Sequence, residues 1–428
     1  MSGECVTGGQ MSGKALIVGS SVAGIRTAQS LRTEGWLGRI IVVGGEPHLP
    51  YDRPPLSKHM LTDRTEISPT PLLTKHEATS DNIELLLGTP AVGLDTTAKR
   101  VALEDHREVP YDHLIIATGA SARPSPWGQM PGLHVLRGLD DCLGLRKALH
   151  GDASAGSGHL VVIGAGFIGS EVAAAARALN LRVSIVAPSA APLVQSLGPE
   201  VGMKLTELHQ RHSVETYFGC AVSSLTSSTD GIHVQLDNGT ELSATSVVVG
   251  IGATPNVEWL KDSGLTLGDG VMCDEQGRAS GRPDISAVGD VACWTMPQAL
   301  ASRRGEHWTR AVEQANLVSR RLCGNSIEDT DRHVDYVWSD LHDWKIQIVG
   351  QPRHCCRSEI VGEFNGAHTK VAVLYSDEEQ RLVGGFIVNW PRATLLLRKA
   401  TEQRSNARAA RALIDAGIPH NSGSNVCR

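Results

Sequence analysis

The chain has 428 residues, of which 41% are apolar and 20% charged, as in globular proteins of two or three domains. Its net charge of −6 is mild and argues against nucleic acid or an anionic membrane surface as a partner. No apolar run approaches the roughly 20 residues of a membrane-spanning helix, and the first residues lack the apolar stretch of a signal peptide. We therefore expect flexible termini at 1–11 and 417–428 and a cytoplasmic location.

The first chemical motif is a glycine-rich turn in the segment KALIVGSSVAGIRTAQ at 14–29. The pattern predicts a strand at 15–18, a helix near 22–34 and a second strand at 39–44. Gly19 and Gly24 hold the outer places of the dinucleotide fingerprint G-x-G-x-x-G, and Ser21 holds the central place. Serine is small enough for a phosphate to approach, but it lacks glycine's freedom at positive φ.

An acidic residue follows the second strand of this unit. Glu46 occupies a place from which a carboxylate can hold a ribose hydroxyl. The alternative is an exposed carboxylate in a loop. Glu46 therefore supports a dinucleotide site only in combination with the glycine turn.

A second copy of the pattern is HLVVIGAGFIGSEVAAAARALNLRVSIVAP at 159–188. Here the fingerprint is complete, with a strand before it and an Ala-rich helix after it, so a phosphate is expected at the helix N-terminus. The next strand ends at Ala187 and Pro188, with neither an acid for NAD nor a basic residue for a 2′-phosphate. Two such sites indicate a flavin and a nicotinamide, because hydride passes directly between them.

The remaining segments predict the domain organisation. Segments 51–80 and 151–158 are rich in Pro, Gly or small polar residues and are expected to be loops. After 326, apolar runs joined by polar turns predict a small antiparallel module closed by one helix near 392–415. The expected fold class is α/β, with two Rossmann-like domains and a C-terminal α+β domain. The expected boundaries are 12–125 and 250–325 for the FAD-binding domain, 126–249 for the NAD(P)-binding domain and 326–416 for the C-terminal domain.

From 14 to 415 the chain resembles the FAD-dependent NAD(P)H:ferredoxin reductases of the putidaredoxin reductase-like family, which have a glutathione reductase-type two-dinucleotide fold. Six segments in the right order carry the resemblance: EPHLPYDRPPLSK (46–58), IIATGASARP (115–124), VGIGATPN (249–256), ISAVGDVA (285–292), GEHWTRAVEQA (305–315) and WSDLHDWKIQIVG (338–350).

The resemblance implies a function. Electrons would pass from NAD(P)H, with NADH favoured, through FAD to a [2Fe–2S] ferredoxin that serves a cytochrome P450 or Rieske-type oxygenase. The protein would be a monomer or a weak homodimer. The alternatives are an NAD(P)H oxidase or specialised biosynthetic flavoenzyme that uses oxygen or a small-molecule acceptor, and a redox-responsive interaction protein.

The resemblance also implies roles for matched positions. Lys58 would lie beside the flavin and pair with Glu171, so that a cation stabilises the anionic reduced flavin. The residues expected to hold FAD are Gly19, Ser21, Ala23, Gly24, Glu46, Arg53, Lys58, Thr118, Gly119, Arg123, Gly289, Asp290, His307, Trp308 and Trp338. The residues expected to hold NAD(P) are Gly164, Gly166, Phe167, Ile168, Gly169, Glu171 and Gly252.

Three departures from the family pattern are notable. Ala187 stands where a glutamate is frequent, which leaves the choice between NADH and NADPH open. His342 stands where a tyrosine is common, so the partner surface or the nicotinamide pocket would be altered. The basic run of Arg303, Arg304 and Arg310 suggests a receptor for an acidic ferredoxin, the alternative being a solvated helix face.

Thiol and metal chemistry are not expected. The nine cysteines include no CxxC or CxxxxC pair, and none lies in 40–60, where single-cysteine relatives of this fold would need one. The vicinal pair Cys355–Cys356 is expected to be structural. The histidines show no metal-ligand spacing.

Overall fold

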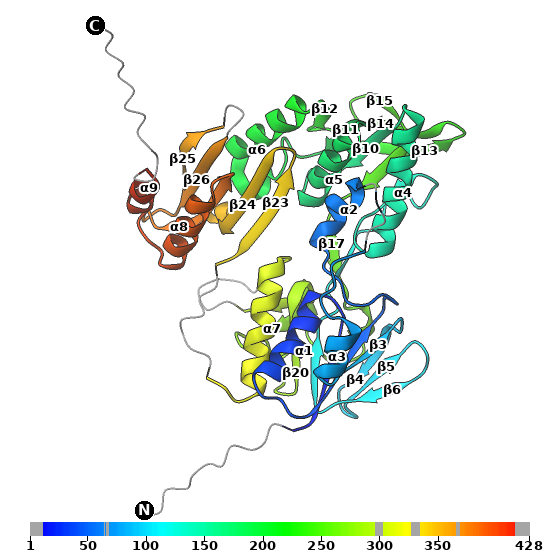
Figure 1. Cartoon of the computed structure of the whole chain (residues 1–428), viewed down its shortest axis with the longest axis vertical. Coiled ribbons are helices and arrows are strands. Elements are labelled where there is room, and N and C mark those ends of the chain that lie inside the picture. The colour runs from blue at the N-terminus through cyan, green and yellow to red at the C-terminus, as the bar shows by residue number, and fades with distance from the viewer. Residues whose placement is uncertain are drawn as a thin grey trace, which may run out of the picture. The chain divides into compact units, whose positions relative to one another are not determined.

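In the computed structural model of this protein, two parallel sheets and one antiparallel sheet carry the fold (Figure 1). The structure describes residues 12–63, 65, 68–295, 303–326, 334–364 and 369–415. The described chain divides into two compact units. Unit 1 contains 12–55, 65–123 and 252–326, and unit 2 contains 56–63, 124–251 and 334–415.

Unit 1 is built on a parallel sheet with the strand order β20-β7-β1-β2-β3. The central strand β1 (Lys14–Val18) pairs with β2 (Arg39–Gly44) on one side and β7 (His113–Ile116) on the other. The outer strands are β3 (Ile83–Leu87) and β20 (Ile285–Ala287). All but the first residue of β1 are buried, as expected for a parallel strand covered on both faces.

Helices α1 (Val22–Thr33) and α7 (Trp308–Leu322) pack side by side in unit 1 (Figure 1). The short helix α3 (Lys75–Ser80) contacts β3. Three smaller sheets complete the unit. Two are antiparallel: β4 (Ala91–Asp95) with β5 (Arg100–Leu103) and β6 (Glu108–Pro110), and β8 (Ala120–Ala122) with β17 (Ala253–Pro255). The third is mixed, in the order β18 (Leu267–Gly268), β19 (Gly270–Cys273), β21 (Ala292–Trp294) and β22 (Arg303–Arg304), with β19 and β21 parallel.

Unit 2 repeats the parallel arrangement with the strand order β12-β11-β10-β16-β9. Its central strand β10 (His159–Ile163) is buried throughout and lies between β11 (Arg182–Ala187) and β16 (Ser246–Val249). The helices of this part are α4 (Leu139–Ala155) and α5 (Phe167–Ala178). The remaining strands are β9 (Leu133–His134), β12 (Val214–Phe218), and the antiparallel β13 (Val222–Ser228), β14 (Gly231–Leu236) and β15 (Glu241–Ala244).

The C-terminal module of unit 2 is an antiparallel sheet in the order β23-β24-β27-β26-β25. Its strands are β23 (Tyr336–Leu341), β24 (Trp344–Gly350), β25 (Arg357–Glu363), β26 (Lys370–Ser376) and β27 (Leu382–Val388). Along β26, Val371 and Val373 belong to one core, whereas Ala372 and Leu374 belong to another. This alternation shows that both faces of the sheet are covered.

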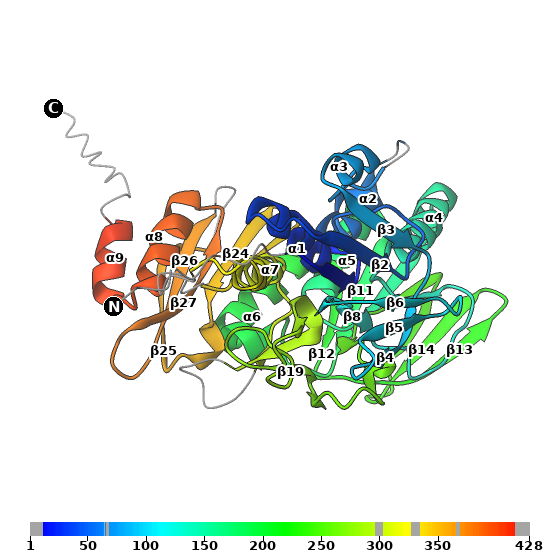
Figure 2. The ribbon, with the colours of Figure 1, turned by 90° about the horizontal axis from the view of Figure 1, so that it is seen from below.

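Each face of that sheet has its own helices. Helices α8 (Pro391–Glu402) and α9 (Ala407–Asp415) cover one face (Figure 2). Helix α6 (Val194–Arg211) contributes Leu205 and Leu208 to the core on the other face and also packs on β12. The same helix therefore joins the C-terminal module to the second parallel sheet.

The turn between β23 and β24 carries the partly buried His342, which contacts two histidines at the C-terminal end of α6. Its Nε2 lies 3.1 Å from Nδ1 of His209 on α6, and its ring stacks on His212 with 4.2 Å between ring centroids. Burial, followed by the neighbouring His209 and His212, lowers the pKa of His342 to about 3. Burial and then His212 lower the pKa of His209 to about 4.

Several local predictions were wrong. Residues 151–155 continue helix α4, because Asp152 accepts hydrogen bonds from Thr245 and Ser246 and the left-handed Gly156 ends the helix only afterwards. The single helix expected near 392–415 is two helices, α8 and α9. Strand β25 was not anticipated, because its seven residues are mostly polar or only partly buried.

The segment 51–80 is also more ordered than its composition indicates. It contains the 3₁₀ turn η1 (Pro54–Ser57) and helix α2 (His59–Thr62) besides α3. Residues 56–63 pack in unit 2. There the carbonyl of Leu56 accepts a hydrogen bond from the Cys142 thiol of α4, and the carbonyl of Leu61 contacts the His150 ring of the same helix. The expected FAD-binding segment 12–125 is therefore interrupted by a stretch that folds with the other unit.

Among the described residues, no helix has the length and apolar character to cross a membrane, and no cluster of His, Cys, Asp or Glu could hold a metal ion. The seven cysteines in the described ranges are free thiols, and these include Cys355 and Cys356. Burial raises the pKa of Cys142 to about 11 and that of Cys273 to about 12, so both are poor nucleophiles.

The buried His209 and the partly buried His342 predict an acid-sensitive fold. Their pKa values are lowered from 6.5 in the folded chain, so below about pH 6.5 the unfolded chain binds protons that the folded chain excludes. Stability should therefore fall as the pH drops from about 6.5 towards 4, by on the order of 2 kcal/mol at pH 5 for His209 alone. Urea unfolding at a series of pH values measures this loss.

His342→Asn should flatten the profile, since asparagine tolerates the φ of +54° at this position and does not titrate. The matched control is His106→Asn, which changes an exposed histidine with a φ of +68°. Equal slopes for His342→Asn and the unsubstituted protein would contradict the assignment.

Candidate functional site

The first glycine turn leaves no room for side chains at its outer positions. Gly19 has a φ of +125°, and a Cβ there would overlap with the carbonyl oxygen of Ala117 at the end of β7. A Cβ on Gly24 would overlap with the carbonyl oxygen of Gly19 itself. Both glycines are therefore required by the backbone packing between β1, α1 and β7.

The central position of this turn does not need glycine. Ser21 is the N-cap of α1 with a φ of −96°, an ordinary extended conformation. The expected loss of freedom at positive φ therefore has no consequence here. The hydroxyl of Ser21 accepts a hydrogen bond from Nε of Arg53 at 3.2 Å, which places a guanidinium at the turn.

The start of α1 is not capped by a side chain, and its first turn contains no acid. By contrast, α3 has a complete Thr74–Glu77 capping box. Because the first N–H groups of a helix need an acceptor, the end of α1 suits an anion such as a phosphate.

Glu46 is held close to this turn by two neighbours. Its Oε1 accepts a hydrogen bond from Arg53 at 2.6 Å, and its Oε2 accepts one from the Tyr51 hydroxyl at 2.5 Å. Glu46 is thus an oriented carboxylate rather than a freely moving loop side chain. Neither Tyr51 nor this pairing was predicted.

One later segment reaches the same turn, and another reaches the segment after Glu46. A Cβ on Gly289, which has a φ of +74°, would lie 2.8 Å from Cβ of Ala23 on α1, so the 3₁₀ turn η3 (Gly289–Val291) that carries Asp290 sits against the helix start. His307 is the N-cap of α7. The next residue, Trp308, donates from Nε1 to Oδ1 of Asp52 at 2.9 Å.

Thr118 and Gly119, which follow β7, are hydrogen-bonded to Asn256. The Thr118 hydroxyl donates to the carbonyl of Asn256 at 2.9 Å, and the Asn256 side chain donates back to the carbonyl of Thr118 at 2.8 Å. Arg123 donates its backbone N–H to the carbonyl of Gly252 at 3.0 Å. Gly252, expected in the NAD(P) set, is therefore part of unit 1.

The second glycine turn has the same construction. Gly164 has a φ of +112°, and its Cβ would overlap with the carbonyl oxygen of Gly250 at the end of β16. A Cβ on Gly169 would overlap with the carbonyl of Gly164. A Cβ on Gly166, in contrast, would meet nothing within 4 Å, so the central glycine faces open space rather than protein.

The helix that follows this turn is also uncapped. Helix α5 has no side-chain cap and no acid in its first turn, and Ile168 there is 43% exposed. Phe167 is partly buried against the core formed with α6. The open side of Gly166 and the uncapped helix end fit the phosphates of a dinucleotide.

Strand register identifies the residue in the place of Glu46. Val18 pairs with Val43 in unit 1, and Ile163 pairs with Val186 in unit 2. Counting on from these pairs, Ser189 corresponds to Glu46, whereas Ala187 corresponds to Gly44. Between Arg182 and Glu200 the chain contains no charged residue, so the loop after β11 is neutral.

Lys58 and Glu171 form the expected ion pair within unit 2. The Lys58 Nζ lies 2.9 Å from Oε2 of Glu171, which is 4% exposed. The hydroxyl of Ser57 also donates to Oε2, and that of Ser339 on β23 donates to Oε1 at 2.5 Å. Trp338 lies next to Ser339 and stacks on Tyr336.

The predicted basic run does not form an exposed face. Arg304 is only 11% exposed and pairs with Asp269 at 3.0 Å and with Glu306. Arg310 is buried, and the side chain of Arg303 lies outside the described residues. The hypothesis that these arginines receive an acidic ferredoxin is therefore wrong for Arg304 and Arg310.

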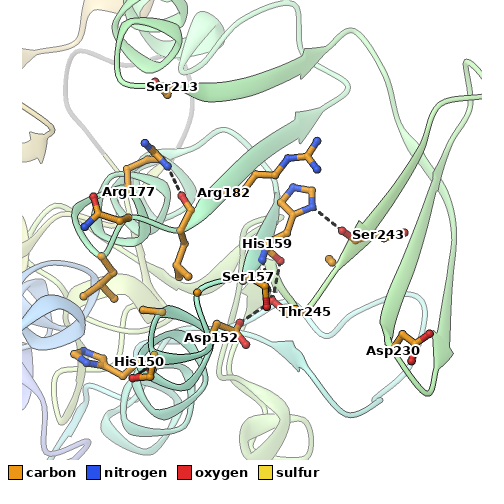
Figure 3. A pocket seen from close by; sticks show the side chains of 18 residues that line it. His150, Asp152, Ser157, His159, Arg177, Arg182, Ser213, Asp230, Ser243 and Thr245 are labelled. Atoms are coloured by element: carbon orange, nitrogen blue, oxygen red, sulfur yellow. Dashed lines mark hydrogen bonds between the residues drawn. The ribbon is translucent and has the colours of Figure 1, made fainter.

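A hollow of about 1210 Å³ lies elsewhere in unit 2, beside His159 and Arg182, where β10 and β11 begin (Figure 3). Dinucleotides bind at the opposite, carboxyl ends of parallel strands. The His159 ring contacts the carbonyl of Ser243 at 2.6 Å (Figure 3). It also contacts the hydroxyl of Ser184 at 2.8 Å. Since this hollow lies at the ends of the strands opposite to the glycine turns, it is not where a dinucleotide is expected.

Comparison with known proteins agrees with this geometry. Residues 13–315 match the model of the pyridine nucleotide-disulphide oxidoreductase family. The chain belongs to this family. A second model, the reductase C-terminal domain, matches residues 336–420 of the oxidoreductase.

The oxidoreductase is 36% identical over 395 residues to rhodocoxin reductase of Rhodococcus erythropolis, covering 90% of this chain and 89% of the relative. It is 33% identical to the ferredoxin–NAD(+) reductase component of the p-cumate 2,3-dioxygenase system of Pseudomonas putida, covering 95% and 97%. The solved covalent putidaredoxin reductase–putidaredoxin complex matches with a TM-score of 0.86 and 30% identity, covering 94% and 98%. Within the family, the chain is a putidaredoxin reductase-like, NAD(P)H-dependent flavoprotein oxidoreductase.

Sequence reasoning missed several residues of this oxidoreductase site. Tyr51, Asp52 and Ser57 lie within the flavin-binding stretch 46–58 and could have been found as donors or acceptors beside the matched residues. Ser339 lies inside the WSD motif, next to the singled-out Trp338. Nothing local marks Ser339 as a partner of Glu171, because 168 positions separate the two residues.

The two glycines of the second turn should respond differently to alanine. Gly166→Ala should leave stability unchanged, because its Cβ enters open space, and should weaken NAD(P)H binding roughly tenfold or more, because that space would receive the phosphates. Gly169→Ala should lower the free energy of unfolding by about 1–3 kcal/mol, because its Cβ overlaps with backbone.

Thermal unfolding without nucleotide and titration with NADH separate the two effects. Gly144→Ala is a matched control for the substitution, since a Cβ there also meets nothing within 4 Å and the residue lies in α4. Normal nucleotide affinity in Gly166→Ala would contradict the assignment of the open space.

Proposed function

We propose that this oxidoreductase passes electrons from NAD(P)H through FAD to a [2Fe–2S] ferredoxin that serves a cytochrome P450 or Rieske-type oxygenase. The observation that carries the proposal is the repetition of one turn geometry, at Gly19–Gly24 and at Gly164–Gly169, in front of two uncapped helices. Two dinucleotides in one chain permit hydride transfer between them. The names of the relatives support ferredoxin as the acceptor.

FAD supplies the conversion between a two-electron donor and a one-electron acceptor. In our proposal Gly19, Ser21 and Arg53 hold its pyrophosphate, since they meet at the uncapped start of α1. Glu46, oriented by Tyr51, holds the adenosine ribose. The residues from Gly164 to Gly169 hold the phosphates of the nicotinamide dinucleotide.

The remaining expected contacts belong to the same proposal. Asp290 would accept from the ribityl chain, and Lys58 would compensate the charge of the reduced flavin. Thr118, Gly119, Arg123, His307, Trp308 and Trp338 would complete the FAD contacts. We also propose a cytoplasmic location, which the free thiols of the described cysteines support because reduced thiols persist in reducing compartments.

Anaerobic stopped-flow spectroscopy tests the function. Mixing with NADH should bleach the flavin rapidly, and cytochrome c should then be reduced rapidly only when a ferredoxin is added. Rapid turnover with oxygen alone would instead identify an oxidase. Slow reduction with a long-lived charge-transfer complex would identify a redox-responsive interaction protein, and both results would overturn the proposal.

The loop after β11 bears on the choice of nicotinamide dinucleotide. An acid in the place of Ser189 would bind the ribose 2′-hydroxyl of NADH and repel the 2′-phosphate of NADPH, but the loop contains no charge. We therefore propose that discrimination between the two dinucleotides is weak. We propose NADH as the favoured donor on the names of ferredoxin–NAD(+) reductase relatives alone.

Ser189→Glu should raise the ratio of kcat/KM for NADH to that for NADPH by roughly tenfold or more, because it adds the missing carboxylate. Steady-state kinetics with each dinucleotide measures the ratio. The matched control is Ser196→Glu, an exposed serine on α6 that changes the net charge equally. An unchanged ratio in Ser189→Glu would show that the adenosine ribose lies elsewhere.

A further inference from the structure

The carboxylate of Glu171 is a buried junction of three donors in unit 2. Its Oε2 accepts from the Ser57 hydroxyl and lies 2.9 Å from Nζ of Lys58, while its Oε1 accepts from the Ser339 hydroxyl at 2.5 Å. Glu171, Ser57 and Ser339 are all at least 96% buried. A buried carboxylate has lost its hydrogen bonds to water, and these donors replace them.

The donors and the carboxylate come from three distant parts of the chain. Ser57 ends the 3₁₀ turn η1, and Lys58 directly follows it. Glu171 lies on α5, the helix that begins at the second glycine turn. Ser339 lies on β23, the edge strand of the C-terminal sheet, where its backbone pairs with Ile346 of β24.

This arrangement gives the two serines a defined physical effect. Each hydroxyl donates to the carboxylate and therefore offsets part of its negative charge, without adding a charge of its own. Because Ser339 holds Oε1, the carboxylate presents Oε2 to Lys58 in one orientation. Without Ser339, Glu171 would act on the ammonium of Lys58 more strongly and in a less fixed direction.

We propose that Ser339 and Ser57 are positioning residues through which the C-terminal module and the η1 turn set the electrostatic effect of the Lys58–Glu171 pair on the flavin. The inference rests on the proposed function, in which Lys58 compensates the negative charge of reduced flavin. Removing either hydroxyl leaves Glu171 less neutralised and makes the surroundings of the flavin more negative. Reduced flavin is then less stable, and its midpoint potential moves to a more negative value.

The test measures the midpoint potential of FAD in the full-length protein by equilibration with redox dyes. Ser339→Ala and Ser57→Ala should each shift the ratio of oxidised to reduced flavin about tenfold towards the oxidised form, about 30 mV for a two-electron couple. Ser339→Thr, which keeps the hydroxyl, should restore the potential. Glu171→Gln should shift the potential in the opposite direction, since it removes the negative charge but keeps the shape.

The matched control is Ser184→Ala. Ser184 is also a fully buried serine of unit 2 whose hydroxyl donates to a carboxylate, that of Glu215 at 3.0 Å, but it lies on β11 in contact with His159. The midpoint potential of FAD in Ser184→Ala should equal that in the unsubstituted protein. A general loss of packing would affect Ser184→Ala and Ser339→Ala alike, so an equal shift in both would overturn the proposal.

The other outcomes are also decisive. An unchanged potential in Ser339→Ala, or a shift with the same sign as in Glu171→Gln, would overturn the positioning role. Failure of the unsubstituted protein to reduce ferredoxin would overturn the proposed function instead. The two failures are distinguishable, because the potential is measured without ferredoxin.

Discussion

One backbone contact recurs in both parallel sheets, and the site depends on it. A carbonyl at the end of a neighbouring strand occupies the space in which the first glycine of each turn would carry its side chain: Ala117 for Gly19 and Gly250 for Gly164. This approach directs the chain from the central strand into the helix so that the helix start is open to a ligand. No residue with a Cβ can take either position without moving the strand.

The two turns differ where packing permits. The central position has an extended conformation in both, with φ of −96° at Ser21 and −80° at Gly166. A side chain is therefore allowed there as far as the backbone is concerned. In unit 1 the serine contributes a hydroxyl that binds Arg53, whereas in unit 2 the glycine leaves an open space.

The Lys58–Glu171 pair depends on a different constraint, the burial of a carboxylate. The negative charge of the Glu171 carboxylate is tolerated because the ammonium of Lys58 and the hydroxyls of Ser57 and Ser339 contact it. The hydrogen bonds from η1 and β23 therefore meet at the carboxylate that α5 carries. The C-terminal module, which α6 joins to the second parallel sheet through an apolar core, thereby also contributes a hydroxyl group to the Lys58–Glu171 ion pair.

The sequence by itself determined the two strand–turn–helix units and the residues of both turns, because those features follow from apolar runs and from local limits on φ. It also determined the pairing of Lys58 with Glu171, through resemblance to a family, and that pairing is present. Only the tertiary structure decided that Ser339 completes this pair, that His342 contacts α6, that Arg304 pairs with Asp269, and that Ser189 stands in the place of Glu46. Each of these depends on groups that are distant in the chain or on the register between strands, and neither is encoded in a local pattern of residues.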